Sequence, residues 1–255
     1  MIHKTAQVSS KAEIGQNVEI GPFTVIEDDV IIGNETIIRS NVIIASGARI
    51  GEKCKIFHGA VLGTVPQDLK FENEKTTLEI GNNTTIREYA TLNRGTTDHW
   101  KTVVGDNCLL MAYSHVAHDC TLGNNVIIAN SVNMAGHVTI EDFVGIGGMV
   151  PIHQFVKIGK HTFIGGGFRV PKDVPPYIRA MGEPLRYAGL NSVGLQRRGF
   201  SSEALSELKK AYRIFYRSNL TVTKALEKIE SDLNQIEEIK DLVRFIKSCE
   251  RGVIR

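Results

Sequence analysis

The sequence has few aromatic residues and no long apolar run. Aromatic residues make up 7% of the 255 positions and include a single tryptophan, so a core built on large rings is disfavoured. Most of the 42% of apolar residues are Ile, Val, Leu and Ala, which suit β layers of uniform thickness. No stretch approaches the ~18 apolar residues of a membrane span, and the N-terminus has no apolar segment of a secretion signal. We therefore expect a cytoplasmic protein without stable membrane insertion.

The sequence also lacks a large net charge of either sign, and its cysteines are not closely spaced. Its formal net charge is +2, with acidic and basic residues interspersed, which argues against nucleic acid as a partner. The four cysteines lie far apart, with no CxxC pair: Cys54, Cys108, Cys120 and Cys249. This spacing indicates neither a disulfide framework nor a zinc ribbon, and burial as small apolar side chains is the simpler interpretation.

The dominant pattern in the sequence is a repeat with a period of six residues. Branched or apolar anchor residues recur at this spacing in three blocks: Ile2, Val8, Ile14, Ile20, Ile26, Ile32, Ile38, Ile44, Ile50, Ile56 and Leu62; then Ile80, Ile86 and Leu92; then Val104, Leu110, Val116, Leu122, Ile128, Met134, Ile140, Ile146, Ile152, Ile158, Ile164 and Val170. Neither the helical period of about 3.6 nor the strand period of 2 explains this spacing. It predicts a triangular parallel β-helix in which three hexads form one coil, so that positions three hexads apart stack.

The interruptions and the end of the period divide the chain. Residues 64–77 and 96–102 are polar and are expected to be loops ejected from a prism that spans residues 1–173. Residues 174–200 are predicted to form an extended, Pro-rich linker. Helical spacing follows in residues 201–255, with helices expected from Ser201–Ser202, over about 222–231 and over about 235–249. The predicted fold class is thus an all-β parallel β-helix with a C-terminal α-helical domain.

The third block of the repeat gathers histidines. Gly136 follows His118 by three hexads, and His137 follows Asp119 by the same interval. On a prism with three hexads per coil these positions stack, and His153 and Gln154 fall on the next coil, so one strip of polar side chains is expected on the outer surface. A histidine beside a carboxylate is suited to general-base catalysis, and a glycine above it can offer its N–H to an oxyanion.

The histidines admit a second interpretation. His115, His118 and His137 could supply three imidazoles to a zinc ion, as in trimeric β-helices of the γ-carbonic anhydrase type. However, His115 and His118 are three positions apart, which points them to opposite faces of a strand unless a corner intervenes. We therefore expect no metal in the site. Because the strip contains no cysteine and the chain has no GxSxG motif, direct attack by the acceptor is favoured over a covalent acyl-enzyme.

The chain resembles the bacterial UDP-N-acetylglucosamine O-acyltransferases over essentially its whole length. The resemblance rests on six runs: PQDLK (66–70), SHVAHDCTLGNN (114–125), AGHV (135–138), HQF (153–155), DVPPY (173–177) and GLNSVGLQRRGF (189–200). It implies a left-handed winding of the β-helix, a homotrimer with active sites between neighbouring prisms, and transfer of an R-3-hydroxyacyl chain to the 3-position of a UDP-amino sugar. The donor would be acyl carrier protein with its phosphopantetheine, without a further cofactor, in the first step of lipid A biosynthesis.

The resemblance also implies roles for individual residues. His118 matches the general base, Asp119 the residue that orients it, and Gly136 the oxyanion donor. Contacts to the sugar or its phosphates are implied for Gln67, Asp68, Lys70, His115, His137 and Gln154, with a less defined role for His153. Asn191, Arg197 and Arg198 match residues that reach the nucleotide from the adjacent subunit, where an arginine pair suits a pyrophosphate.

Some positions depart from the family pattern. Val193 stands where a glutamate is frequent, and Asn93 where a histidine is frequent. Because such changes lie near the acceptor, both the 3-hydroxyl sugar and its 3-amino analogue stay open as acceptors. Gly166 falls where the family sets acyl-chain length; glycine there leaves room for a longer chain, although Phe163 and Phe168 could narrow the groove.

Overall fold

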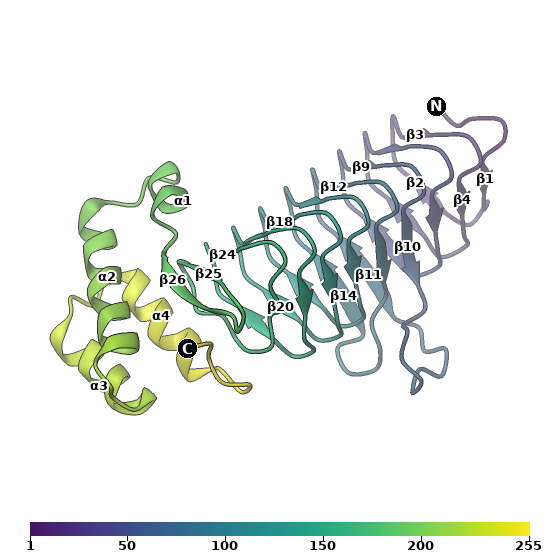
Figure 1. Cartoon of the computed structure of the whole chain (residues 1–255). Helices are drawn as coiled ribbons and strands as arrows, with labels where there is room; N and C mark the ends of the chain where they lie inside the picture. The colour runs from purple at the N-terminus through teal and green to yellow at the C-terminus, as the bar shows by residue number, and fades with distance from the viewer.

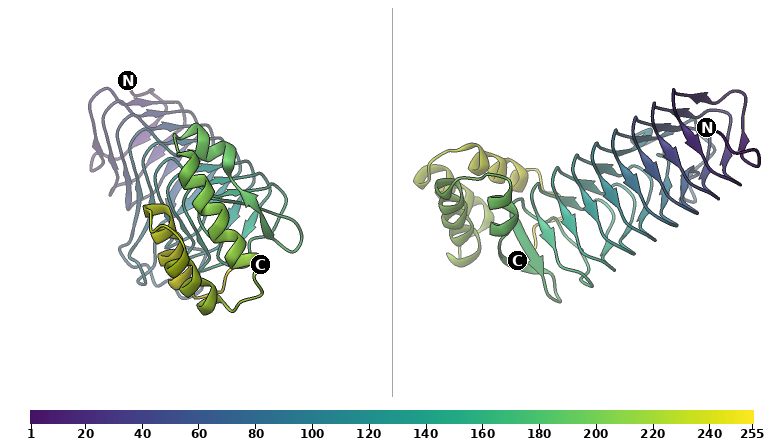
Figure 2. Two further views of the ribbon diagram at one scale, coloured as in Figure 1. Left: turned by 90° about the vertical axis from the view of Figure 1, so that its left-hand side faces the viewer. Right: turned by 90° about the horizontal axis from the view of Figure 1, so that it is seen from above.

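The hexads form short strands that are joined by tight corners into a triangular prism (Figure 1). The structure is a computed structural model that describes residues 1–255. Three parallel sheets make the three faces of the prism, because each coil contributes one strand to each sheet. The prism carries a small helical region at its C-terminal end, and the N-terminus lies at the opposite end (Figure 2).

The strands follow one another around the three sheets. Sheet one holds β1 (Gln7–Val8), β4 (Val25–Ile26), β7 (Ile43–Ile44), β10 (Val61–Thr64), β13 (Thr91–Asn93), β16 (His115–Val116), β19 (Asn133–Met134) and β22 (Pro151–Ile152). Sheet two holds β2 (Glu13–Ile14), β5 (Ile31–Ile32), β8 (Ala48–Ile50), β11 (Thr77–Ile80), β14 (Lys101–Val104), β17 (Thr121–Leu122), β20 (Thr139–Ile140) and β23 (Lys157–Ile158). Sheet three holds β3 (Glu19–Ile20), β6 (Ile37–Ile38), β9 (Lys55–Ile56), β12 (Thr85–Ile86), β15 (Leu109–Leu110), β18 (Ile127–Ile128), β21 (Gly145–Ile146), β24 (Phe163–Ile164), β25 (Ile178–Met181) and β26 (Arg186–Leu190).

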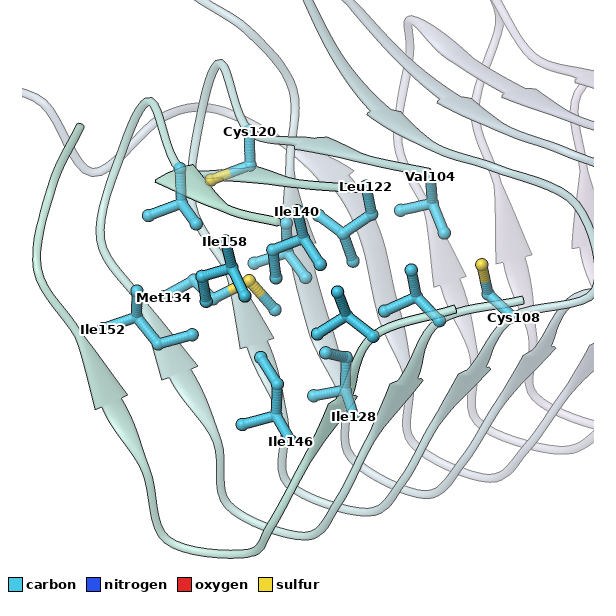
Figure 3. Packing of buried hydrophobic residues seen from close by; sticks show 14 of the residues in the cluster. Val104, Cys108, Cys120, Leu122, Ile128, Met134, Ile140, Ile146, Ile152 and Ile158 are labelled. Atoms are coloured by element: carbon cyan, nitrogen blue, oxygen red, sulfur yellow. The ribbon is translucent and has the colours of Figure 1, made fainter. Parts of the chain in front are cut away.

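The anchor residues fill the interior of the prism, as their period predicts. From Ile20 to Val170 every anchor is at most 4% exposed, and Figure 3 shows those of the third block pointing inward from all three sheets. The first anchor is different, because no coil lies below it: Ile2 is 52% exposed. Strand register keeps positions three hexads apart in line, as in His115 opposite Asn133 and Thr121 opposite Thr139.

Most corners of the prism have one residue in the left-handed backbone conformation, and these residues recur six positions apart. Glycine and asparagine adopt this conformation most readily, and Asn107 and Asn125 do so with φ of 56° and 57°. Other corners carry bulkier residues in the same conformation, including Asp119, His137 and Phe155, with φ of 58°, 62° and 64°. The coil geometry imposes this conformation on whichever residue occupies the corner, so these three side chains leave the prism in one column.

The two ejected loops leave the prism from one edge. Residues 65–76 connect β10 to β11, and residues 94–100 connect β13 to β14, so each loop lies between sheet one and sheet two. We call this the site edge. It also carries the turns between β16 and β17 and between β19 and β20, which hold Asp119 and His137. The second loop was expected over 96–102, but β14 begins at Lys101.

The segment expected to be an extended linker has defined structure. Residues 174–200 contain the antiparallel hairpin β25–β26, which extends sheet three beyond the last coil, and the short helix α1 (Ser192–Arg197). A hairpin forms here because the open end of the sheet offers backbone hydrogen bonds to another strand.

Three further helices complete the chain: α2 (Ser202–Arg217), α3 (Val222–Asp232) and α4 (Glu237–Lys247). The Ser201 hydroxyl caps α2 by accepting a hydrogen bond from Ala204 N at 3.1 Å, at the start predicted from the sequence. The apolar faces of α2 and α4 are buried together with residues of the hairpin, so the helices cover the end of the prism. None of the helices has the length and apolar character needed to span a membrane.

Candidate active site

The site edge brings the four central residues of the predicted strip together. His118 and Asp119 lie in the turn after β16, and Gly136 and His137 in the turn after β19. The strands on either side of these two turns pair in register, so each residue of the upper turn lies one coil above its counterpart. The spacing of three hexads therefore predicts the stacking of these four residues correctly.

His118 and Asp119 form a hydrogen-bonded dyad. His118 Nδ1 lies 2.8 Å from Asp119 Oδ2, and the carboxylate is buried while the imidazole keeps 14% of its surface exposed. Because an ionised carboxylate only accepts hydrogen bonds, Nδ1 carries the proton and Nε2 presents a lone pair. This is the arrangement that a general base needs: an oriented ring with its free nitrogen available to a substrate.

The second loop fixes the carboxylate of the dyad. Thr96 donates two hydrogen bonds to Asp119, from its backbone N–H at 2.9 Å and from its hydroxyl at 2.7 Å. Burial alone would raise the pKa of Asp119, but hydrogen bonds from His118 and Thr96 and the charge of His137 hold it well below its ordinary value. Sequence reasoning missed Thr96, whose only available signal was a loop that leaves the prism from the edge of the strip.

Replacing Thr96 with valine tests this clamp. Thr96→Val removes the hydroxyl donor and keeps the side-chain shape, so we expect the pKa of Asp119 to rise and the dyad to lose its fixed orientation. The expected effect is a fall in kcat of about tenfold, equivalent to about 1.4 kcal/mol, with little change in the KM of the sugar. Steady-state kinetics measures both constants. Thr97→Val, one residue away and exposed, is the matched control. Equal effects in the two variants would show that the hydroxyl has no positioning role.

Gly136 lies directly against the imidazole of the dyad. A Cβ atom placed on Gly136 would be 2.6 Å from His118 Cε1 and 2.8 Å from Nε2, so only glycine fits without moving the ring. The carbonyl of Gly136 accepts a hydrogen bond from Phe155 N, whereas its own N–H donates to no backbone or side-chain acceptor. The turn therefore holds Gly136 against the His118 ring and leaves its backbone N–H free to donate to a ligand, and a donor of this kind can stabilise a developing oxyanion.

His137 packs among rings on both sides. Its imidazole stacks on Phe155 at a centroid distance of 4.4 Å and meets His118 edge-on at 5.1 Å. Burial lowers the pKa of His137, against the opposing effect of Asp119. The turn of the next coil holds His153 and Gln154, as the strip predicts, and its corner residue Phe155 is the one that packs on His137.

The other histidines of the strip lie to either side of the dyad. His115, on β16, faces outward from sheet one, where its Nδ1 lies 2.8 Å from the Thr91 hydroxyl, and burial lowers its pKa. His153 and Gln154 are exposed. His153 also borders a separate cavity of about 360 Å³ between the last coil and the tip of the hairpin.

The first loop carries three predicted sugar or phosphate contacts. Asp68 Oδ1 accepts a hydrogen bond from Lys70 N at 3.0 Å, which forms a tight local turn, and the side chains of Gln67 and Lys70 are exposed. The loop is attached to the prism by Asn93, which donates two hydrogen bonds of 3.0 Å to Thr64 Oγ1 and Val65 O. Asn93, noted from the sequence as a departure from the family pattern, thus positions the start of this loop.

The three predicted nucleotide contacts lie on another edge. Asn191 donates a hydrogen bond of 3.0 Å to His161 O, in the turn between β23 of sheet two and β24 of sheet three. Arg197 and Arg198 are both exposed, and the guanidinium of Arg198 lies over the Phe143 ring at 4.9 Å. One chain therefore does not bring these residues to its own dyad.

The predicted acyl-length residues lie near the third edge, between sheets three and one. Gly166 is exposed, and a Cβ there would be 3.1 Å from Gly148 O. Phe163 lies over Gly145, and Phe168 lies over Gly165. The atoms nearest to a Cβ on Gly166 are backbone atoms of the coil below and not either phenyl ring.

The metal-ligating groups at this edge differ from the set considered from the sequence. Two groups have donor atoms within 4.8 Å of one another, His118 with Asp119 and His137, and Asp98 with His99 and His137. Neither includes His115. No cysteine is available as a nucleophile either: Cys120 follows the dyad directly, but its side chain is buried in the prism, where burial raises its pKa to about 12.

Fold and site together define an acyltransferase of the hexapeptide-repeat class. Residues 11–46 and 101–136 match the family model of bacterial transferase hexapeptides, and residues 173–254 match that of the second domain of UDP-N-acetylglucosamine O-acyltransferase. The chain belongs to the family of acyl-[acyl-carrier-protein]–UDP-N-acetylglucosamine O-acyltransferases. The member from Aquifex aeolicus is 57% identical over 100% of this chain and 98% of its own length, and that from Chlorobaculum parvum is 58% identical over 98% and 96%.

Solved structures agree over the whole chain. The UDP-N-acetylglucosamine acyltransferase from Bacteroides fragilis superposes with a TM-score of 0.99 at 48% identity, covering 100% of both chains. The corresponding protein from Acinetobacter baumannii gives 0.97 at 42% identity, covering 100% of this chain and 99% of its own. The predicted fold class, a left-handed parallel β-helix with a C-terminal helical region, is thereby confirmed.

Proposed function

We propose that this protein transfers an R-3-hydroxyacyl chain from acyl carrier protein to the 3-position of UDP-N-acetylglucosamine or of its 3-amino analogue. The reaction would be the first step of lipid A biosynthesis, in the cytoplasm. The observation that carries the proposal is the dyad of His118 and Asp119 packed against Gly136, whose backbone N–H has no acceptor within the chain. Family membership at more than half identity supports the same donor and acceptor.

The geometry supports direct transfer in a single displacement. His118 Nε2 takes the proton from the 3-hydroxyl or 3-amino group as that group attacks the thioester carbonyl. The carbonyl oxygen becomes an oxyanion, which the N–H of Gly136 stabilises. Collapse of the tetrahedral intermediate breaks the carbon–sulfur bond, and His118 returns the proton to the departing phosphopantetheine thiolate. No acyl-enzyme forms, and we propose that no metal or further cofactor takes part.

The polar residues around the dyad suit a nucleotide sugar. Lys70 is exposed on the first loop, in the turn that its N–H closes on Asp68, and Gln67 is exposed next to this turn. Lys70 supplies a cation for a phosphate. His137 and Gln154 lie in turns of the site edge, and His115 lies next to it on β16. All three offer hydrogen bonds to the sugar, and His153 lies at the margin.

The positions of the remaining residues support a homotrimer with sites between chains. Asn191, Arg197 and Arg198 lie on a different edge of the prism from His118. Packing of parallel prisms would bring these residues of one chain to the site edge of the next, where the arginines could bind a pyrophosphate. Arg198, stacked on Phe143, has to leave that ring or bind from its present position.

The acyl chain would lie along the prism toward Gly166. The adjacent glycines Gly148 and Gly166 leave a surface without side chains there, which favours a longer chain. Phe163 and Phe168 flank this surface and would limit its width.

Mass spectrometry of the products tests the function. The protein is incubated with a mixture of R-3-hydroxyacyl carrier proteins of different chain lengths, with UDP-N-acetylglucosamine and its 3-amino analogue both present. We expect acylation at the 3-position, selection of a narrow range of long chains, and preference for one acceptor. Absence of transfer to either acceptor from any donor would contradict the proposal.

A further inference from the structure

The second loop faces His137 with two additional metal-ligating side chains. Asp98 Oδ2 lies 3.1 Å from His137 Nδ1 and 3.7 Å from His99 Nε2, and all three donor atoms fall within 4.8 Å of one another. This group lies on the outer side of the dyad, where the loop passes the corner of the coil above. Nothing in the proposed transfer reaction uses Asp98 or His99.

The hydrogen bonds of His99 leave its outer nitrogen free to bind a metal. His99 Nδ1 lies 3.1 Å from the backbone carbonyl of Asp119. A carbonyl only accepts, so Nδ1 carries the proton and Nε2, on the side of Asp98, presents a lone pair. Metal-binding histidines are commonly oriented in this manner, with the second nitrogen donating to a carbonyl or carboxylate.

His137 presents its Nδ1 to the same point. This atom is buried and makes no hydrogen bond, although Asp98 Oδ2 lies within ion-pair distance of it. The opposite nitrogen, Nε2, lies on the side of Asp119, at 3.9 Å from Oδ2. Because Phe155 stacks on the ring and His118 meets it edge-on, His137 has a fixed orientation before any ion arrives.

We propose that Asp98, His99 and His137 form a binding site for a zinc-class divalent cation. Two imidazole nitrogens and one carboxylate oxygen are a common zinc donor set, with the fourth tetrahedral position left to water. Bonds of about 2.0–2.1 Å in a tetrahedron separate ligand atoms by about 3.3 Å. The distances from Asp98 Oδ2 to the two imidazole nitrogens, 3.1 Å and 3.7 Å, lie on either side of this value. The third pair of donor atoms, on the two imidazoles, lies within 4.8 Å, so a movement of the loop toward His137 completes the site.

An ion at this position would inhibit transfer. This consequence rests on the proposed function, in which His137 contacts the acceptor sugar. Zinc would hold the Nδ1 lone pair of His137 and place a divalent charge beside the carboxylate that orients His118. It would thus compete with the sugar for His137, and its effect would weaken as the UDP-sugar concentration rises.

Equilibrium dialysis of the untagged full-length protein against zinc tests binding without reference to activity. We expect one equivalent bound by the unsubstituted protein and binding at least tenfold weaker in both His99→Gln and Asp98→Asn. His58→Gln, which removes an exposed histidine on another edge, should bind as the unsubstituted protein does. The visible spectrum of bound cobalt provides a second readout, because tetrahedral coordination gives intense bands.

Several outcomes would overturn the inference. If the unsubstituted protein and His99→Gln bound zinc equally weakly, the proposed site would be wrong. Loss of binding in His118→Ala with retention in His99→Gln would place the ion on the dyad instead. The inhibitory role predicts inhibition by zinc that excess UDP-sugar relieves. Activation of acyl transfer by zinc would refute this role. Failure of acyl transfer in zinc-free protein would count against the proposed function alone, since dialysis measures the site independently.

Discussion

His118→Ala is expected to lower the rate of acyl transfer by about three orders of magnitude, within the range of ~10²–10⁴ that general-base catalysis contributes. The reason lies in the dyad, where Asp119 holds Nδ1 at 2.8 Å and leaves Nε2 as the free base. Alanine leaves the acceptor hydroxyl without a proton acceptor, while substrate binding through the first loop is unaffected. Measurement of kcat with hydroxyacyl carrier protein and UDP-N-acetylglucosamine gives the effect.

The variant should remain folded, because His118 lies at a corner and the anchors on either side of it are untouched. Circular dichroism and gel filtration check the fold and the assembly. His58→Ala removes an exposed histidine from a different edge and should keep full activity. If folded His118→Ala retained more than a tenth of the rate, the assignment of His118 as the base would be wrong.

Gly136→Ala is expected to lower kcat by about 10²–10³, the effect of losing an oxyanion-hole donor in other enzymes. The added Cβ would lie 2.6 Å from His118 Cε1 and 2.8 Å from Nε2. Either the imidazole or the backbone of the turn has to move, and both movements separate the base from the N–H donor. Single-turnover kinetics at saturating acceptor measures the chemical step directly.

A double-mutant cycle separates the two possible consequences of the added methyl group, displacement of the His118 imidazole and movement of the turn backbone. In a His118→Ala background the methyl has no ring to displace, so Gly136→Ala should have a much smaller effect there than in the unsubstituted protein. Gly136→Ser, with a larger side chain, should be at least as damaging as alanine. A kcat for Gly136→Ala within threefold of the original value would exclude this glycine from the reacting centre.

The period of six residues is enough to predict the part of the site that stays on the prism. Once anchors and coils are assigned, the neighbours of Asp119 and His118 on the next coil follow by counting, and the structure places His137 and Gly136 there. The same count places Phe155 above His137, where the two rings stack, and Gln154 above Gly136, with His153 beside it in the same turn.

The other residues of the site do not follow the period of six, so counting along the sequence could not predict their positions. Thr96, Asp98 and His99 belong to a loop whose path depends on its own hydrogen bonds to Asp119. The hairpin in the segment expected to be a linker arises because the last coil leaves an open sheet end, a tertiary effect without a local pattern. The handedness of the winding likewise came from family resemblance and not from spacing.

The coil of three hexads determines where the length of this chain is free to change. Val61 pairs with Thr91 across the first loop, and Thr91 pairs with His115 across the second. Both intervals are longer than three hexads, yet the coils on either side stay in register. Insertions at the site edge are thus absorbed outside the prism. A deletion of one hexad between His118 and Gly136 would instead rotate every later residue by one face and carry Gly136 to an edge without His118. Homologues of different length should therefore differ in their loops or by whole coils.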